Sequence, residues 1–224
     1  RSDGGSWRLA GSIRIEGGSF WDDQTQQQIE GYPEPKFVNC VWDDNHVGGF
    51  NDLGAGGAIA IRDASPTFVG CTFMNNGAGG RGGAVYTQTF NAEHASSPQF
   101  RYTLFKNNHA ENQDDVGWGG AVTMEGPGIP QFIGCSFEGN RARSENNSGR
   151  GGAVQIEYWQ PDYGTNVLFS RCIFVDNVAE GNNGGAQGGA IYTSAPFEMV
   201  NSIVVKNRVQ GNNGSGGGLS IQIN

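Results

Sequence analysis

A two-part motif recurs six times along the 224 residues and constrains the fold more than any other feature. Its first part sets an apolar, usually aromatic residue, a small residue, a second apolar residue and Asn at fixed spacing, as in Phe68, Cys71, Phe73 and Asn76. Its second part is Gly-Gly-Ala, or Gly-Gly-Gly in the last copy, followed by an aliphatic residue. Successive motif Asn residues are 31, 32, 32, 37 and 30 residues apart. A period of this length predicts a solenoid.

The repeats favour β-structure over helix. They carry Val, Ile, Thr, Tyr and Phe in short alternating runs between turn residues, and the chain contains 38 glycines. Leucine-rich repeats are excluded because no L-x-x-L-x-L frame exists, and propeller repeats do not stack along an axis. We therefore predict an all-β fold, a parallel β-helix with two or three short strands per coil. The handedness rule for parallel crossovers makes it right-handed.

Aligned repeats form columns whose character predicts the core. The inward columns are small (Cys40, Cys71, Thr103, Cys135, Cys172, Ser202), aromatic (Trp42, Phe73, Phe105, Phe137, Phe174, Val204) and aliphatic (Ile59, Val85, Val122, Val154, Ile191, Leu219). Two mixed columns are expected to face solvent: Ala60, Tyr86, Thr123, Gln155, Tyr192, Ser220, and Arg62, Gln88, Glu125, Glu157, Ser194, Gln222.

The Asn column is predicted to be a structural ladder at a turn. Asn accepts left-handed backbone angles, and its amide can donate to one neighbouring coil and accept from the other. A residue repeated six times is a poor candidate for catalysis. The ladder residues are Asn45, Asn76, Asn108, Asn140, Asn177 and Asn207.

The F-x-x-N and G-G-A-[ILV] pair resembles the repeat of the chlamydial polymorphic outer-membrane proteins. It stands at 73–76, 105–108, 137–140 and 174–177, while Trp42 and Val204 replace Phe in the first and last copies. The resemblance covers residues 35–224 and implies a β-helix of the pectate-lyase-like kind. It also implies the passenger of an autotransporter, associated with adhesion at the cell surface.

The composition limits the classes of partner that the protein can bind. The formal charge of −8 and the pI near 4.8 argue against nucleic acid, which is bound through a basic stripe. No signal peptide and no transmembrane run is present, so a mature form or a section of a longer protein is expected, located outside the cell or on its surface.

Cysteine and histidine usage gives two further expectations. Cys40 with Cys71, and Cys135 with Cys172, lie on adjacent coils, where either disulfides or a ladder of free thiols is feasible; parallel Cβ vectors favour free thiols. The three histidines, His46, His94 and His109, are scattered over loops without metal-ligand spacing, which argues against a transition-metal site.

The polar connectors between Asn and Gly-Gly are expected to be solvated loops along one edge. In coil 3 they contain Asp114 and Asp115, candidate calcium ligands whose simpler interpretation is a solvated acidic loop.

A second connector is enlarged in coils 2 and 4, at 88–99 and 157–168. The two inserts frame a strand face on which Glu125 and Glu157 share a column, with carboxylates about 5 Å apart, as in a retaining glycosidase. Candidate sugar-binding residues are Tyr86, Gln88, Gln155, Tyr158, Trp159 and Tyr192. The simpler alternative is two surface glutamates in a polar column.

The sequence thus predicts a degenerate N-terminal coil at 1–34 and six coils at 35–224. The leading function is a structural stalk or adhesion scaffold that binds host or matrix surface molecules, without a cofactor. The alternatives are a glycan-cleaving enzyme or carbohydrate-binding module, and a filament subunit that self-associates end to end through its open coils.

Overall fold

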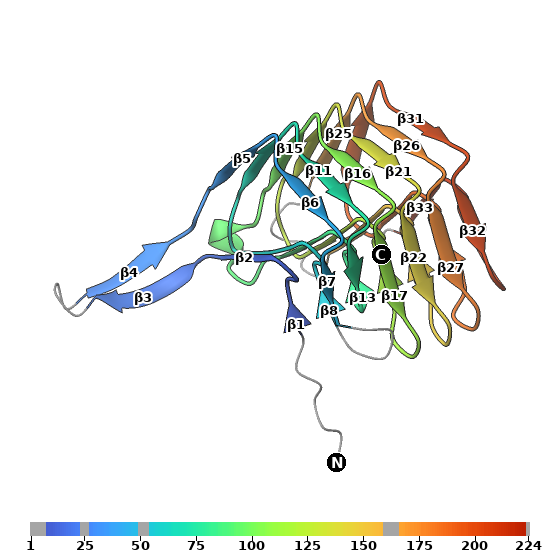
Figure 1. The fold of residues 1–224 in the computed structure, drawn as a ribbon, viewed down its shortest axis with the longest axis horizontal. Coiled ribbons are helices and arrows are strands. Elements are labelled where there is room, and N and C mark those ends of the chain that lie inside the picture. Colours follow the sequence, from blue (N-terminus) through green and yellow to red (C-terminus); the bar gives the residue numbers. More distant parts are fainter. Residues whose placement is uncertain (1–7, 23–26, 49–53, 159–165, 223–224) are drawn as a thin grey trace, which may run out of the picture.

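The chain forms a parallel β-helix (Figure 1). The computed structural model describes residues 8–22, 27–48, 54–158 and 166–222. Five parallel sheets run along the stack, and equivalent residues of successive repeats pair in strict register, as in Phe68 with Phe100. The fold class predicted from the repeat is therefore confirmed, although coils 1 to 5 contribute five strands each and coil 6 four, instead of two or three.

Two sheets carry the aromatic repeat. The β5 sheet contains β5 (Lys36–Val38), β10 (Thr67–Val69), β15 (Gln99–Arg101), β20 (Gln131–Ile133), β25 (Val167–Ser170) and β30 (Phe197–Val200), which begin coils 1 to 6. The β6 sheet contains β6 (Val41–Asp43), β11 (Thr72–Met74), β16 (Leu104–Lys106), β21 (Ser136–Glu138), β26 (Ile173–Val175) and β31 (Ile203–Val205).

The third wall of the core is the β9 sheet, which follows Gly-Gly. It contains β2 (Ile13–Glu16), β9 (Ile59–Arg62), β14 (Val85–Gln88), β19 (Val122–Glu125), β24 (Val154–Glu157), β29 (Ile191–Thr193) and β33 (Leu219–Ile221). Its β2 strand pairs with β9, which confirms a degenerate N-terminal coil.

The two remaining sheets are built from the polar connectors. The β7 sheet contains β7 (His46–Val47), β12 (Gly77–Ala78), β17 (His109–Asn112), β22 (Arg141–Ser144), β27 (Val178–Gly181) and β32 (Arg208–Gln210). The β8 sheet contains β1 (Arg8–Leu9), β8 (Gly54–Ala55), β13 (Gly80–Arg81), β18 (Gly117–Trp118), β23 (Gly149–Arg150) and β28 (Ala186–Gln187).

Two elements lie outside the coils. An antiparallel hairpin of β3 (Gly18–Asp22) and β4 (Gln27–Gly31) projects away from the stack, and the sequence analysis did not predict it (Figure 1). A single 3-10 turn, η1 (Ala92–His94), lies in the coil 2 insert. The part of the chain that the structure describes contains no helix with the length and hydrophobicity needed to cross a bilayer.

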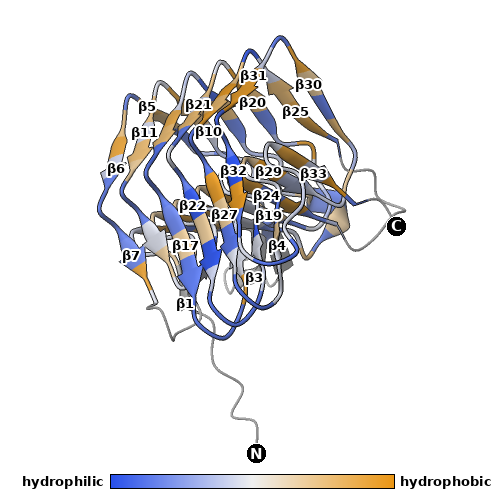
Figure 2. Cartoon of the chain, turned by 90° about the vertical axis from the view of Figure 1, so that its right-hand side faces the viewer, coloured by the Kyte–Doolittle hydropathy of each residue, from blue (hydrophilic) through white to orange (hydrophobic). Residues whose placement is uncertain are grey.

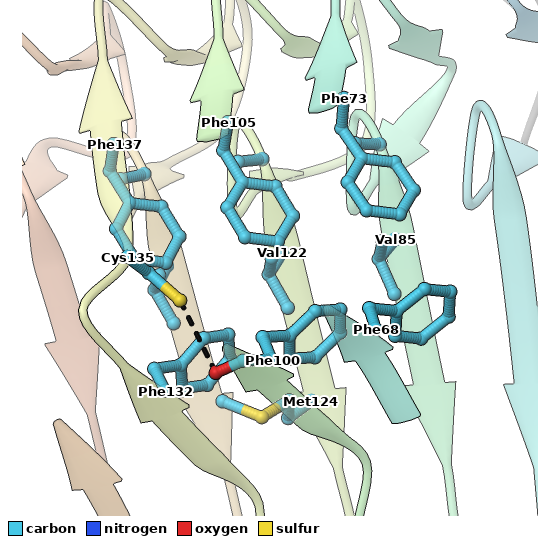
Figure 3. Close-up of a cluster of buried hydrophobic side chains, with 14 of the residues drawn as sticks. Phe68, Phe73, Val85, Phe100, Phe105, Val122, Met124, Phe132, Cys135 and Phe137 are labelled. Atoms are coloured by element: carbon cyan, nitrogen blue, oxygen red, sulfur yellow. Dashed lines mark hydrogen bonds between the residues drawn. The ribbon is translucent and has the colours of Figure 1, made fainter. Parts of the chain in front are cut away.

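The core is built from two columns of stacked rings (Figure 3). In the β6 sheet the column runs from Trp42 to Phe174 with centroid spacings of 4.6–5.1 Å. In the β5 sheet a second column runs from Phe37 to Phe169 at 4.9–5.1 Å. Rings of different columns meet edge to face, the arrangement that aromatic quadrupoles favour. The aromatic stack predicted for the β6 sheet is confirmed, and a second stack in the β5 sheet packs against it.

The Asn column forms the predicted ladder. The Oδ1 atom of Asn108 accepts from the backbone N and the Nδ2 of Asn76, both on the preceding coil. The Nδ2 atom of Asn108 donates to the carbonyl of Phe73 and to Oδ1 of Asn140. The pattern repeats through Asn207, so each buried amide is fully satisfied.

The left-handed residue of this turn is the one before the ladder Asn. Its φ lies between 53° and 62° in all six coils, at Asp44, Asn75, Asn107, Gly139, Asp176 and Lys206. The first Gly of each Gly-Gly pair is also left-handed, with φ of 57° at Gly119. A side chain at the second, Gly120, would meet the carbonyl oxygen of Gly152 at 2.1 Å, which explains the glycine pair.

The connectors are not the solvated loops that the sequence suggested. After the ladder Asn the chain runs outward in the β7 sheet, turns in a hydrophilic loop (Figure 2) and returns in the β8 sheet. The two layers lie so close that a Cβ on Gly117 would meet the carbonyl oxygen of Arg143 at 2.1 Å. Solvent reaches the loop tips and the outer face of the β7 sheet, where the side chain of Arg141 is 40% exposed.

This folded-back layer also changes the exposure of the mixed columns. We expected them to face solvent, yet Thr123 and Gln155 are fully buried, and Tyr86 and Tyr192 are each 4% exposed. Glu125 is 2% exposed, while its neighbours Gln88 and Glu157 are half-buried. Side chains from the β8 sheet reach over the outer face of the β9 sheet and cover these positions.

The four cysteines are free. The thiol of Cys135 donates to the carbonyl oxygen of Phe100 at 3.3 Å, and that of Cys172 to the carbonyl oxygen of Phe132 at 3.3 Å (Figure 3). Each of these two thiols hydrogen-bonds to the backbone of the preceding coil and forms no disulfide across coils. The ladder of free thiols favoured from the sequence is therefore confirmed.

We expect four thiols per chain to react with a thiol reagent once the protein is unfolded without reductant. In the folded protein Cys40 should react first, because Cys71, Cys135 and Cys172 are at most 1% exposed. Mass spectrometry of alkylated protein measures both numbers. A chain that gives fewer than four thiols after denaturation would contradict the free ladder.

Candidate functional site

A cluster of charged, amide and aromatic side chains lies on the outer face of the β9 sheet. It joins two sheets, because its arginines and tryptophan come from the β8 sheet and its carboxylates from the β9 sheet. We call it the outer cluster; its members are Arg81, Tyr86, Trp118, Glu125, Arg150, Gln155, Glu157, Gln187 and Tyr192.

Glu125 is the most buried charged group of the outer cluster. One carboxylate oxygen pairs with Arg81 and the other accepts from the hydroxyl of Tyr86 at 2.6 Å. Burial raises the pKa of Glu125, while the Arg81 charge and the Tyr86 hydrogen bond oppose that rise. Burial, together with the adjacent Glu125 carboxylate, also raises the pKa of Tyr86. This carboxylate is held in one geometry by the half-buried Arg81 and the buried Tyr86.

Trp118 lies between arginines of neighbouring coils. The guanidinium of Arg81 is 4.5 Å from the Trp118 ring centroid and that of Arg150 is 5.6 Å away. Arg150 also lies 5.0 Å from the ring of Tyr192. Cation–π contact of this kind favours Arg, whose planar group stacks on the ring. Among the described residues Arg150 has no ion-pair partner. Its guanidinium charge is stabilised by the rings of Trp118 and Tyr192 instead.

Glu157 lies beside Glu125 on the neighbouring strand, in direct register. It is half-buried and accepts a hydrogen bond of 3.3 Å from Nε2 of Gln155. Burial raises the pKa of Glu157, and the charges of Arg150 and Arg81 oppose that rise. The predicted adjacency of the two glutamates is therefore present, with Glu157 on the accessible side.

The geometry favours ligand binding over glycoside cleavage. A retaining mechanism needs a carboxylate that can attack the sugar. The Glu125 side chain is fully buried and both its oxygens are engaged, so it offers no surface to a substrate. Glu157, Arg150 and Gln187 are half-buried and can meet a polar ligand from outside.

Three predicted ligand residues lie elsewhere or outside the described residues. Gln88 pairs in register with Glu125 but accepts a hydrogen bond from Arg62 at 3.3 Å. Tyr158 packs against the hydrophobic core, since it follows the inward Ile156 by two positions. Trp159 lies outside the described residues. Of the predicted set, Tyr86, Gln155 and Tyr192 join the outer cluster.

The candidate calcium ligands hold a loop together. The backbone N atoms of Asp114 and Asp115 both donate to Oδ1 of Asn112, at 3.0 and 2.7 Å. The Asp114 carboxylate accepts from Nδ2 of Asn146 on the next coil at 2.7 Å. Within the described ranges, no group of three or more His, Cys, Asp and Glu side chains is arranged to hold a metal ion.

Arg81, Trp118 and Arg150 were not predicted from the sequence. Each stands one residue before Gly-Gly, in a column that pairs in register through Ala55, Arg81, Trp118, Arg150 and Gln187. The column was visible in the alignment of repeats. Its large polar and aromatic members were not considered as site residues, because the connectors were assigned as solvated loops.

Comparison with known families supports the repeat. Residues 70–88, from the end of β10 to β14, match the Chlamydia polymorphic membrane protein (Chlamydia_PMP) repeat. That stretch is similar to a repeat of surface proteins. It contains the ladder residue Asn76 and the Gly82-Gly83 turn, so the matched features are those that build the coil. Neither the curated proteins nor the solved structures contain a significant match.

Proposed function

We propose that the protein is a surface-exposed scaffold whose outer cluster binds an extended polar ligand, with polysaccharide as the ligand class. The repeat similarity supports a surface-exposed β-helical protein. Strict register, stacked rings and the Asn ladder favour a stiff body that presents side chains at fixed spacing. These features support a scaffold role.

The observation that carries the ligand proposal is unused hydrogen-bonding capacity in the outer cluster. Four buried atoms lack a hydrogen-bond partner within the described part of the chain: Trp118 Nε1, Arg150 Nε, Gln155 Oε1 and Gln187 Oε1. An unpartnered buried polar atom costs about 1–3 kcal/mol. Of the four residues, Arg150 and Gln187 are half-buried, so a ligand rich in hydroxyl groups can reach them and offer an acceptor to Arg150 and a donor to Gln187.

The accessible side chains of the outer cluster, Arg150, Glu157 and Gln187, are planar hydrogen-bonding groups, which suits a hydroxyl-rich ligand such as a saccharide. The rings of the cluster lie beneath them and are at most 8% exposed. Arg150 carries a charge that no described carboxylate neutralises within ion-pair distance, which favours an acidic sugar over a neutral one.

The test is retention of acidic and neutral polysaccharides by the immobilised chain, with product release measured on the same samples. We expect acidic glycan to be retained and released intact by salt. Arg150→Gln is expected to weaken retention about tenfold, the change expected from loss of about 1.4 kcal/mol. The control is Arg101→Gln, an exposed arginine of the β5 sheet that should bind like the parent.

Each alternative result has a clear meaning. Shortened products that disappear in Glu157→Gln would replace the binding proposal by glycan cleavage. Equal loss in Arg101→Gln would indicate general charge effects and contradict the outer cluster as the site. Absence of retention across the panel would contradict a saccharide ligand.

A further inference from the structure

The β7 sheet contains a notch at coil 2. The connector of coil 2 is the shortest, and its first strand position is Gly77, where coils 1 and 3 have His46 and His109 in register. A cavity of about 220 Å³ is lined there by His46, Gly48, Gly77, Ala78, Gly79, His109 and Glu111. We call this feature the coil 2 notch. It lies on a different sheet from the outer cluster.

We propose that the coil 2 notch binds a divalent transition-metal ion such as Zn²⁺ between His46 and His109. The two histidines are far apart in the sequence, which argued against a metal site. The coil brings them together because the residue between them has no side chain, and their ring centroids are 5.3 Å apart with planes tilted by 51°.

This ring separation suits one shared ion. A Zn–N bond of about 2.0–2.1 Å places the ion about 3.2 Å from the imidazole centroid. Two imidazoles at a tetrahedral angle then have centroids about 5.2 Å apart. The observed centroid distance of 5.3 Å is compatible with this value.

Both rings border the point where a Cβ on Gly77 would lie. A Cβ built on Gly77 lies 2.5 Å from Nε2 of His109 and 2.5 Å from Cδ2 of His46, the carbon bonded to that ring's Nε2. The Nδ1 atom of His46 is 3.3 Å from the carbonyl oxygen of Asp44. A carbonyl only accepts, so Nδ1 carries the proton and Nε2 keeps its lone pair for a metal.

The other described residues that line the notch do not supply a third close ligand. Glu111, two residues after His109 on β17, lines the notch and lies 3.4 Å from Arg141. Arg141 is also paired with Glu180, so its charge is neutralised from two sides. Two protein ligands leave the remaining positions to water, which predicts a modest affinity and an ion that can exchange.

The experiment is titration of the whole chain with Zn²⁺ by calorimetry and with Ni²⁺ by NMR of the histidine ring protons. One Zn²⁺ per chain is expected, and Ni²⁺ should broaden His46 and His109 together. The third histidine, His94, is an internal control because it stacks on Tyr32 at 3.5 Å, in another part of the fold. His46→Ala and His109→Ala should each weaken binding at least about tenfold, while His94→Ala should not.

A second variant separates ion binding from loss of imidazole. Gly77→Ala keeps both histidines and places a methyl group between their rings, where only mobile side-chain atoms have to move. It should weaken Zn²⁺ binding without lowering thermal stability. Broadening of one histidine alone, equal broadening of His94, or absence of Zn²⁺ heat in the parent protein would each overturn the proposal and leave a surface histidine pair only.

Discussion

Replacing Arg81 by methionine is expected to destabilise the protein by about 3–5 kcal/mol, the cost of removing one partner from a buried ion pair. Arg81 is 18% exposed and pairs with Glu125, whose side chain has no exposed surface. Methionine keeps much of the side-chain volume but leaves the Glu125 carboxylate without its cation. The same change removes the guanidinium from the face of Trp118. Chemical denaturation of both proteins at neutral pH measures the difference.

The pH dependence of that loss identifies its cause. Burial already raises the pKa of Glu125, and Arg81 opposes the rise, so Arg81→Met should raise the pKa further above the unfolded value of about 4.3. A carboxyl with a raised pKa binds protons more tightly in the folded state. Stability then falls as pH rises from the unfolded pKa to the folded pKa, and acidification restores it. We therefore expect a smaller loss at about pH 5 than at about pH 7.

Two control variants separate burial from ion pairing as such. Arg14→Met removes a pair of 2.6 Å with Glu16 whose side chains are 48% and 37% exposed, and it should cost less than about 1 kcal/mol. Arg81→Met combined with Glu125→Gln removes both charges and should be more stable than Arg81→Met alone. Equal losses in Arg14→Met and Arg81→Met would contradict a buried charge as the source.

The core of the fold was predictable because its columns are chemically uniform. In a parallel stack each residue contacts its counterpart one coil away, so one repeat period fixes every contact. The column from Trp42 to Phe174 and the Asn ladder could therefore be assigned from the alignment of repeats alone, and both are confirmed.

The connectors were misassigned because their packing uses small residues. A hydrophobic pattern marks strands that pack through large side chains, whereas β18 and β22 approach so closely that Gly and Ala fill the space. The repeats nevertheless contain one column that marks the β7 sheet. The residue two positions after each ladder Asn is always Val or Ala: Val47, Ala78, Ala110, Ala142, Ala179 and Val209. That column is the inner face of the β7 sheet.

The candidate site was half predictable for the same reason. Glu125 and Glu157 share a strand column, so their adjacency followed from the repeat period and is observed. Their exposure did not follow, because Arg81, Trp118 and Arg150 arrive from another sheet of the coil. The coil 2 notch is a similar case, since a short connector brings His46 and His109 across a missing side chain.

Asn108→Ala is expected to destabilise the protein by about 2–4 kcal/mol, because it leaves several buried groups of neighbouring coils without partners. The backbone N of Asn76 loses its acceptor, and the Phe73 carbonyl and Asn140 Oδ1 each lose a donor. Asn108 is fully buried, so water cannot replace these bonds without opening the turn. Asn140→Ala should behave alike, since it occupies the same environment one coil later.

Asn45→Ala is the matched control, since it changes the same residue type in the same column at the first rung. Asn45 donates to Oδ1 of Asn76 and to the carbonyl of Asp43, and Asn76 Oδ1 still accepts from the Asn45 backbone in the variant. No buried donor is orphaned, so a loss of about 1 kcal/mol or less is expected. Urea midpoints for the three variants decide between a ladder and six independent turns. Independent turns would give three equal losses, whereas a hydrogen-bonded ladder makes the interior rungs the costly ones.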